Sequence, residues 1–460
     1  MDKVVPVKKN NDYEIYIDDF GNMGEGIGKV DNFTVFVKDA VKGEKVKAKI
    51  IKVNKNFAIG KLIDVIEKSE DRAEPVCSIY NKCGGCQLQH LKYEKQLEFK
   101  KNKVTECLRR IAKVDLSPVK INETIGMETP NYYRNKVQLP VGEVNGEVKI
   151  GFYRERSHDI IEVDKCFIQD DTANEIMLVV KKWIKDFNIE AYNEALGKGV
   201  LRHIMIRKAF KTGQIMLVLV TNTEKLPQKK ELIHRITTEI KGIKGIIQNI
   251  NNKKTNVVLG QREITLWGEN IIEDYIGEFK FNVSSKSFFQ VNPVQTEKLY
   301  ETALRFAGLT GNEVVFDAYC GTGTISLFLS QKANKVYGVE MVPEAIENAK
   351  INAQQNGVDN AEFIVGKAEE EIPKLIEKGI KPEIVVVDPP RKGCEKALLE
   401  SIASGEPRTI VYVSCDPATL SRDLGILNEL GYEVKEVQPV DMFPETGHVE
   451  TVVLLQRGIM

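Results

Sequence analysis

The chain has 460 residues, 42% of them hydrophobic and 28% charged, a length that exceeds one ordinary core and indicates two or three domains. No apolar run is long enough to cross a bilayer, and the first residues are polar and charged rather than signal-like. We therefore expect no membrane association and a cytoplasmic protein. Its eight cysteines should be reduced thiols, metal ligands or catalysts rather than disulfides.

The charge is unevenly distributed along the chain. The formal net charge is −1, yet residues 1–120 contain 24 Lys and Arg against 18 Asp and Glu, a local net charge of +6. A basic front end on an otherwise acidic chain suits a polyanion-binding module attached to a catalytic body. A solvated lysine-rich surface explains the charge equally well, so charge alone leaves the partner open.

Residues 1–68 predict a small, five-stranded, OB-like β-barrel. Short strand-like segments are separated there by Gly and by Asp or Asn turns, the pattern of small all-β folds. The segments are Glu14–Ile17, Gly26–Val30, Thr34–Val37, Val46–Val53 and Phe57–Val65.

Residues 69–285 predict a central α+β domain. A cysteine- and glycine-rich stretch at 77–90 precedes a segment with helix-like apolar spacing, which predicts a helix over about Tyr93–Ile111. This helix is a candidate for packing on the catalytic domain. Expected strands follow at Val137–Val141, Lys149–Tyr153, Leu201–Ala209 and Gln214–Val220.

Residues 286–460 predict an α/β domain with a mainly parallel, doubly wound, Rossmann-like sheet. Strands and helices alternate there, which is typical of this fold. The expected strands are Val314–Asp317, Val336–Glu340, Glu362–Val365, Ile384–Asp388, Thr409–Val413 and Thr451–Gln456.

A glycine-rich turn after the first of these strands predicts a nucleotide-like cofactor. Gly321 and Gly323 let the backbone approach a bound group, and Glu340 ends the next strand, where it can accept ribose hydroxyls. A dinucleotide site needs a third glycine, and Asp317 suits a ligand with an amino group better than a pyrophosphate. Adenosylmethionine is therefore favoured over NAD. An ordinary turn between strand and helix is the alternative.

Two further loops at strand ends predict the chemistry. Asp388-Pro389-Pro390-Arg391 resembles the loop of amino-methylating enzymes, but Arg391 replaces the aromatic residue that stacks a target base, which favours a different target atom. Cys415 follows the next strand. A thiolate that adds to C6 of a pyrimidine makes C5 reactive toward a methyl donor, and a base must then remove the C5 proton. Cys415 is the candidate thiol and Glu450 the candidate base. The alternatives are that Cys415 is an inert buried cysteine and that Glu450 is an ordinary surface carboxylate.

Four other cysteines predict a metal centre. Cys77, Cys83 and Cys86 are clustered with Gly84-Gly85 between the last two, and Cys166 is remote. Three clustered thiols plus one distant thiol suit a [4Fe–4S] cluster that pins the cysteine loop to the central domain. Zinc held by four cysteines is the rival.

Taken together, these motifs resemble the RNA uracil-C5 methyltransferase family, and within it the branch that acts on 23S ribosomal RNA, over essentially the whole chain. The resemblance implies an N-terminal TRAM barrel, an iron–sulfur domain and an adenosylmethionine-binding domain. It implies Cys415 as nucleophile, Glu450 as base and the four cysteines as cluster ligands. It also implies cofactor contacts at Gln290, Tyr319, Thr324, Glu340, Lys367 and Asp388, a base-pocket residue at Phe288 and an RNA-facing residue at Arg134.

The expected partner is therefore 23S ribosomal RNA, bound by a monomer. Transfer RNA is an alternative substrate, against which the barrel and the four cysteines argue, because the tRNA branch generally lacks both. A non-catalytic RNA-binding iron–sulfur protein is a second alternative. It would not need Cys415 and Glu450 together.

Overall fold

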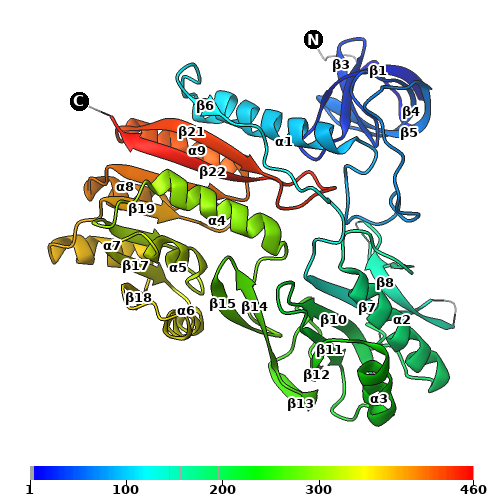
Figure 1. The fold of residues 1–460 in the computed structure, drawn as a ribbon. Coiled ribbons are helices and arrows are strands. Elements are labelled where there is room, and N and C mark those ends of the chain that lie inside the picture. Colours follow the sequence, from blue (N-terminus) through cyan, green and yellow to red (C-terminus); the bar gives the residue numbers. More distant parts are fainter. Residues whose placement is uncertain (1–4, 145, 156, 195, 459–460) are drawn as a thin grey trace.

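A computed structural model of the chain describes residues 5–144, 146–155, 157–194 and 196–458 (Figure 1). The N-terminal part is a closed five-stranded barrel with strand order β1-β2-β3-β5-β4, which confirms the sequence expectation. Its strands are β1 (Asp12–Phe20), β2 (Gly26–Val30), β3 (Phe33–Lys38), β4 (Lys45–Val53) and β5 (Phe57–Glu67). Alternate residues such as Val35 and Val37 are fully buried, as the two-residue period of a strand requires.

The central part is a seven-stranded sheet of order β13-β12-β11-β10-β7-β8-β9. Its elements are β7 (Lys136–Val144), β8 (Glu147–Tyr153), β9 (Ile160–Glu162), α2 (Asp171–Asp186), β10 (Leu201–Lys208), β11 (Ile215–Thr221), α3 (Lys229–Glu239), β12 (Ile243–Ile250) and β13 (Arg262–Gly268). Helices α2 and α3 pack on one face of this sheet. The opposite face contributes Met205, Met216 and Val218 to the core of the C-terminal part.

The C-terminal part is an eight-stranded sheet of order β18-β17-β16-β19-β20-β22-β21-β6. The neighbouring strands β18, β17, β16, β19 and β20 run parallel to one another. Strand β22 is antiparallel to both β20 and β21, so the mainly parallel sheet is confirmed. The elements are α4 (Pro293–Ala307), β16 (Val314–Ala318), α5 (Thr324–Ser330), β17 (Lys335–Glu340), α6 (Pro343–Gln355), β18 (Ala361–Val365), α7 (Ala368–Glu377), β19 (Ile384–Val387), α8 (Lys396–Ser404), β20 (Thr409–Ser414), α9 (Pro417–Glu429), β21 (Tyr432–Val440) and β22 (Glu450–Arg457).

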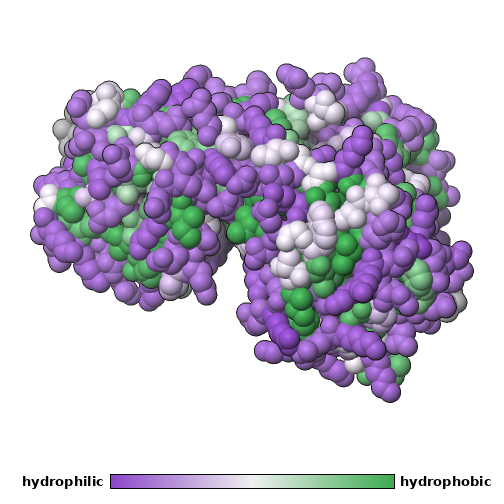
Figure 2. Space-filling view, turned by 60° about the horizontal axis from the view of Figure 1, so that its bottom comes forward, coloured by the Kyte–Doolittle hydropathy of each residue, from purple (hydrophilic) through white to green (hydrophobic). Residues whose placement is uncertain are grey.

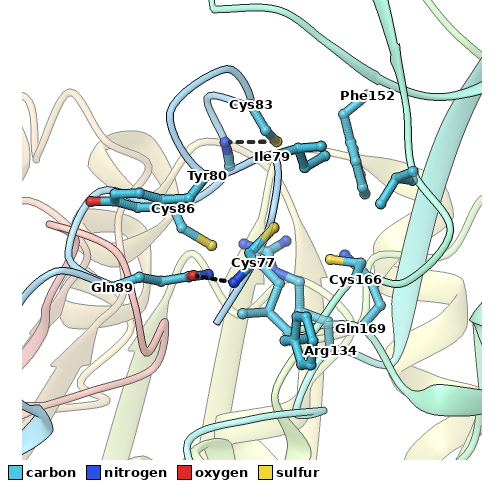
Figure 3. Close-up of a pocket in the computed structure, with 14 residues that line it drawn as sticks. Cys77, Ile79, Tyr80, Cys83, Cys86, Gln89, Arg134, Phe152, Cys166 and Gln169 are labelled. Atoms are coloured by element: carbon cyan, nitrogen blue, oxygen red, sulfur yellow. Dashed lines mark hydrogen bonds between the residues drawn. The ribbon is translucent and has the colours of Figure 1, made fainter. Parts of the chain in front are cut away.

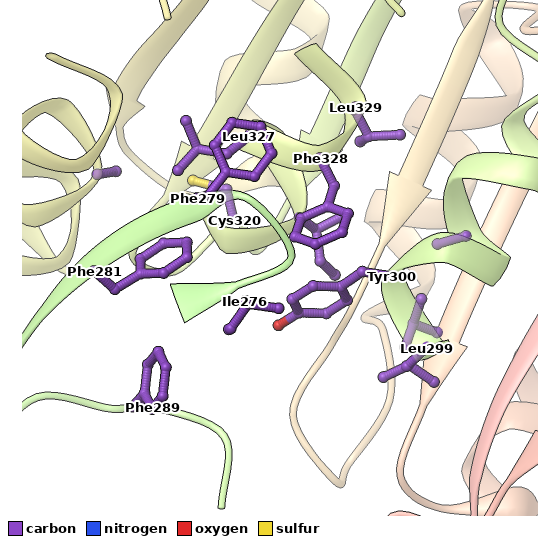
Figure 4. Packing of buried hydrophobic residues seen from close by; sticks show 14 of the residues in the cluster. Ile276, Phe279, Phe281, Phe289, Leu299, Tyr300, Cys320, Leu327, Phe328 and Leu329 are labelled. Carbon is purple, nitrogen blue, oxygen red and sulfur yellow. The ribbon is translucent and has the colours of Figure 1, made fainter. Parts of the chain in front are cut away.

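A hairpin joins the central part to the C-terminal part. Strands β14 (Ile271–Ile276) and β15 (Phe279–Ser284) form a separate two-stranded sheet. Phe279 packs against Phe328 with ring centroids 5.4 Å apart, and Tyr300 packs edge-on against the same ring at 5.2 Å (Figure 4). Burial of these rings couples the two parts through apolar surface.

The predicted long helix is divided into two forms. Helix α1 (Tyr93–Cys107) is α-helical, and the π-helical turn η1 (Leu108–Ala112) continues it to a left-handed residue at Lys113. Val104 and Leu108 pack into the core of the C-terminal part, and β6 (Lys120–Ile121) pairs with β21. The chain therefore enters the C-terminal part before it forms the central sheet. None of the helices in the described part combines the length and apolar character that a membrane span needs.

The loop of residues 441–449, which connects β21 to β22, is tied to helix α1 by buried polar contacts. The fully buried Lys100 donates to the Asp441 carboxylate and, over 3.0 Å, to the carbonyl of Phe443. Tyr93 donates to the other Asp441 oxygen at 2.8 Å. Burial lowers the pKa of Lys100, and the neighbouring Asp441 opposes that effect. This loop leads directly into Glu450.

The 441–449 loop also contacts the barrel and the cysteine-rich segment. The backbone N–H groups of Gln87 and Leu88 donate to the carbonyl of Glu445 at 2.8 and 3.0 Å. A side chain at Gly447 would lie 2.9 Å from the backbone of Met23 in the barrel, so the two chains meet closely there. The loop is thus the point where the barrel, the cysteine-rich segment and helix α1 meet.

We expect Lys100→Met to lower the free energy of unfolding by about 3–5 kcal/mol, because it leaves the Asp441 carboxylate buried without a cation. Urea unfolding of the full-length protein measures the loss. Lys95→Met, which removes an exposed lysine paired with Glu98 on the same helix, is the matched control and should cost about 0.5 kcal/mol or less. Equal effects of the two substitutions would show that the buried pair does not stabilise the fold.

Candidate active site

The predicted cofactor turn follows β16 and carries three left-handed residues. The φ angles of Tyr319, Gly321 and Gly323 are +67°, +54° and +79°. A Cβ at Gly323 would also lie 3.0 Å from the Phe363 ring, so glycine is needed there for both conformation and space. Tyr319 has a positive φ although it carries a side chain, and a non-glycine residue in this backbone region is typical of functional sites. The turn presents its backbone toward the ends of the parallel strands.

Three carboxyl groups lie at the strand ends around this turn. Asp317 is fully buried, accepts a hydrogen bond from Ser326 at 2.5 Å, and has a pKa raised to about 7, chiefly by burial. Burial also raises the pKa of Asp388 to about 7. Glu340 accepts from the backbone of Val342 at 3.0 Å. A cluster of carboxyl groups in a poorly solvated site favours a positively charged ligand, because a cation stabilises their ionised forms.

The other predicted cofactor residues differ in how they are placed. The hydroxyls of Thr324 and Tyr300 are 3.0 Å apart, so the Thr324 side chain is already partnered within the protein. Lys367 is exposed and binds Glu370 at 3.1 Å, which leaves only its backbone for a ligand. The carbonyl of Gln290 accepts from the Asn135 amide at 2.9 Å, which links the central sheet to this site.

Cys415 and Glu450 lie at the ends of two neighbouring strands. Strand β20 ends at Ser414, which pairs with Thr451 of the antiparallel strand β22. This is the last pair of the ladder. Cys415 follows it on one strand and Glu450 precedes it on the other, close enough for the Glu450 charge to act on the Cys415 thiol. Sequence position alone separates them by 35 residues, and the sheet brings them together.

The site shifts the pKa of both groups upward. Burial raises the pKa of the Cys415 thiol to about 11, with further contributions from Glu450 and Asp388. Burial raises the pKa of Glu450 to about 8, and Asp388 adds to the shift. Arg391 acts in the opposite direction on both, because its cation stabilises the thiolate and the carboxylate. Opposing charges around one thiol and one carboxyl are the electrostatic signature of an active site.

The four predicted metal ligands line one cavity of about 150 Å³. Figure 3 shows that Cys77, Cys83, Cys86 and Cys166 surround it from the cysteine-rich loop and from the central domain. The backbone N–H of Gly85 donates to the Cys83 sulfur at 3.4 Å. Among the described residues, no group of three or more ligand-type side chains converges closely enough to hold a single metal ion.

The two predicted RNA-facing residues differ in exposure. Phe288 is 74% exposed, an unusual state for a large apolar ring, whereas the adjacent Phe289 is buried. The guanidinium of Arg134 lies 5.6 Å from the centre of the Phe443 ring and also lines the cysteine cavity. Tyr133 is buried and donates to the Pro444 carbonyl at 3.0 Å, so it is a core residue.

Sequence reasoning missed two sets of residues. One set anchors the loop that leads into Glu450, and the other lies near the Phe288–Phe289 segment, which we call the aromatic loop. Lys100 and Asp441 carry no motif, and only the fold brings them together. Lys136 and Arg207 stand opposite each other on β7 and β10. The alternation of Arg134 and Lys136 with buried neighbours was the one available signal for a charged face.

Comparison with known proteins identifies the class. Residues 92–458 match the family described as tRNA (uracil-5-)-methyltransferase, and residues 6–63 match the TRAM domain. The chain therefore belongs to this family of adenosylmethionine-dependent RNA methyltransferases. This supports an RNA methyltransferase rather than the non-catalytic RNA-binding alternative.

Individual relatives extend over the whole chain. The chain is 84% identical to an uncharacterized RNA methyltransferase of Clostridium acetobutylicum, over 99% of both chains. It is 61% identical to one of Clostridium tetani, over 99% of this chain and 98% of that one. Among solved structures, it resembles the tRNA (uracil-54, C5)-methyltransferase of Pyrococcus abyssi in complex with S-adenosyl-L-homocysteine. That match has a TM-score of 0.77 and 27% identity, and it covers 96% of this chain and 99% of the other.

We expect Glu450→Gln to lower the pKa of Cys415, because it removes a negative charge that disfavours the thiolate. Arg391→Met should raise the same pKa by removing the opposing cation. The pH dependence of alkylation at Cys415, followed by peptide mass spectrometry, measures both. Alkylation of Cys107 in the same samples is the internal control, and its profile should not move. Shifts in the reverse directions would contradict the electrostatic arrangement.

Proposed function

We propose that this enzyme methylates C5 of uridine in 23S ribosomal RNA through a covalent adduct between Cys415 and C6 of the base. The neighbourhood of β20 and β22 supports this proposal, because Cys415 and the buried Glu450 flank the last pair of their ladder and the Glu450 charge acts on the thiol. All of these groups come from a single chain, which supports a monomer as the working unit.

In the first step the Cys415 thiolate attacks C6, the C5–C6 double bond opens, and the electron pair moves onto O4 as an enolate. Bound adenosylmethionine supplies an electrophilic methyl group, and its positive charge favours the ionised forms of Asp388 and Cys415. Arg391 acts in the same sense from the Asp388 loop. C5 would then form a bond to the methyl carbon while the methyl–sulfur bond of the cofactor breaks and its electron pair leaves with the sulfur as a thioether. The resulting C5 is saturated and carries one proton.

In the second step Glu450 removes the C5 proton, the double bond re-forms, and the thiolate leaves C6. The raised pKa of about 8 makes the ionised form of Glu450 a stronger base than an ordinary carboxylate, and the Arg391 cation favours that ionised form. Because Glu450 lies near Cys415, we propose that both act on the same uracil ring. Cys415 leaves C6 while Glu450 takes the proton from the neighbouring carbon, C5.

The cofactor site follows from the carboxyl groups and the turn. We propose that Gln290, Tyr319, Glu340 and Asp388 contact adenosylmethionine, with the backbone of Gly321, Gly323 and Lys367 and the hydroxyl of Thr324 nearby. The buried Oδ1 of Asp317 has no hydrogen-bond partner among the described residues, which suits a donor on the ligand. Phe288, exposed beside Gln290, is proposed to stack on the target base, as exposed aromatics do on unpaired RNA bases.

The RNA substrate has two candidates. The four cysteines favour 23S ribosomal RNA through the resemblance stated above. The similar Pyrococcus abyssi enzyme is named for tRNA and aligns with 96% of this chain, so the barrel does not argue against tRNA as we expected from the sequence. Bisulfite-free mapping of 5-methyluridine in ribosomal and transfer RNA from a deletion strain tests the choice. Loss of 5-methyluridine from tRNA alone would replace ribosomal RNA in the proposal.

We propose a [4Fe–4S] cluster held by Cys77, Cys83, Cys86 and Cys166. The cavity of about 150 Å³ far exceeds the roughly 10–15 Å³ that a single water molecule needs. A single zinc ion would need four sulfurs within about 2.3 Å of one point, and the described residues include no such convergent group. The N–H group directed at the Cys83 sulfur suits a cluster thiolate.

We expect RNA that carries 5-fluorouridine at the target to form a stable adduct with the enzyme, because fluorine at C5 cannot be removed as a proton. Denaturing gels with labelled RNA detect the adduct. Cys415→Ala should abolish it, and Cys394→Ala, which removes a buried cysteine of the same domain, is the matched control that should retain it. An adduct in the Cys415→Ala variant would refute the nucleophile assignment.

For Glu450→Gln we expect methylated RNA to remain linked to Cys415, because the amide cannot take the C5 proton. The rate of product release should fall by about 100-fold or more, the range typical of general-base removal. Single-turnover assays with methyl-labelled cofactor separate transfer from release. Free product at the normal rate would remove Glu450 from the base role.

Anaerobically purified protein should be brown and contain about four iron and four sulfide per chain, the composition of a cubane cluster. Cys86→Ser should lose the colour and the iron, whereas Cys107→Ser should keep both. Zinc as the sole metal, measured by elemental analysis, would overturn the cluster proposal.

A further inference from the structure

Three cations lie together beside the aromatic loop without acidic partners. Lys136 on β7 stands opposite Arg207 on β10, and opposite residues of an antiparallel pair share one face of the sheet. Arg134, two residues before Lys136, is close enough for its positive charge to act on Lys136. None of the three forms an ion pair with any carboxylate in the described part of the chain.

Arg207 is the most buried of the three. It is 4% exposed, and its guanidinium donates to the carbonyls of Ser285 and Ser287 at 3.2 and 2.5 Å. Its Nε atom has no partner in the described structure. Burial alone lowers its pKa to about 10, with no acidic group to offset the effect. A buried cation of this kind is costly unless an anion joins it.

Lys136 responds to its cationic neighbours. Burial lowers its pKa to about 8, and the positive charges of Arg207 and Arg134 add to the shift. Lys208, next to Arg207 on β10, provides the contrast, because it binds both Asp170 carboxylate oxygens at 2.9 and 3.0 Å and shows ordinary pairing. The fold neutralises one lysine of this strand pair and leaves the other uncompensated.

The cations lie next to the proposed target-base site. The carbonyls that Arg207 holds belong to the segment that leads into the exposed Phe288. Asn135, between Arg134 and Lys136, binds Val291 through its backbone at 2.9 Å and Gln290 through its amide. Figure 2 shows a notch between the C-terminal and central parts of the molecule, into which an RNA strand can enter.

We propose that Lys136 and Arg207, assisted by Arg134, form a phosphate-binding subsite for the RNA backbone at a nucleotide adjacent to the target uridine. The inference rests on the proposed function, which supplies the RNA strand. A base that leaves its stack needs its sugar–phosphate chain held, and a phosphate is the anion that three neighbouring donors suit. The half-buried Lys136 thus remains available for the substrate, and the positive charge of Arg207 lies beside it.

The first test is the salt dependence of RNA binding. We expect Lys136→Gln to weaken binding roughly tenfold and to reduce the slope of log affinity against log salt by about 0.7, the value for one phosphate contact on a single strand. Lys208→Gln is the matched control and should keep the wild-type slope, because Asp170 already neutralises that lysine. An unchanged slope for Lys136→Gln would overturn the proposal.

The second test locates the phosphate. RNAs with a single neutral methylphosphonate at each linkage around the target are compared for binding. Wild-type enzyme should lose roughly tenfold at one linkage, and Lys136→Gln should lose less than wild type at that linkage, because one of its cations is already missing, while responding normally elsewhere. Equal losses in both proteins at every linkage would contradict the subsite.

The third test uses pH and the conservative variant. Lys136→Arg keeps the charge, so it should restore affinity and the salt slope. In wild-type enzyme, affinity should fall as the pH rises through about 8, because free Lys136 loses its proton there and a bound phosphate favours the charged form. Lys136→Arg should show no such fall. A fall that persists unchanged in that variant would assign it to another group.

These outcomes separate the two proposals. Normal methyl transfer with a wild-type salt slope in Lys136→Gln would refute the phosphate subsite and leave the methyltransferase proposal intact. A reduced slope with no adduct on 5-fluorouridine RNA would support the subsite and refute the uracil chemistry. Circular dichroism of each variant, compared with wild type, confirms that the binding loss arises in a folded protein.

Discussion

The ion pair between Lys100 and Asp441 lies at the end of β21, where the 441–449 loop begins. Because both groups are fully buried, each depends on the other for compensation, and the loop cannot leave helix α1 without exposing an unpaired charge to a poor solvent. The loop in turn contacts the cysteine-rich segment through Glu445 and the barrel through Gly447. Glu450 follows immediately, so its position depends on contacts made by helix α1, the cysteine-rich segment and the barrel.

The electrostatics of the site form a second layer on this scaffold. Asp317, Asp388 and Glu450 all have raised pKa values, chiefly because they are buried. A cationic cofactor and Arg391 act against that effect, so the ionisation of Cys415 and the binding of the methyl donor are coupled. The central part shows the opposite case. Burial lowers the pKa of Arg207 and of the half-buried Lys136, and the phosphates of an RNA strand would stabilise their charged forms.

Much of the fold could be predicted from the sequence, because the barrel strands and the alternating C-terminal elements have strong local patterns. The placement of Cys415 at a strand end was also predictable. The proximity of Cys415 to Glu450 depended on β22 lying antiparallel beside β20, which alternation of residues cannot specify. The role of Lys100 was hidden, because a lysine on an amphipathic helix looks the same whether it faces solvent or a buried carboxylate. Lys136 and Arg207 lie 71 positions apart and meet only through the β7–β10 register.

Strand β6 already belongs to the C-terminal sheet. Two connecting segments therefore join the central part to the C-terminal part, one leaving near Gly126 and one returning through Val291. Asn135 and Val291 hydrogen-bond where these connections run together. Because the two connections are fastened to each other, the spacing between Phe288 and Lys136 should persist when RNA binds.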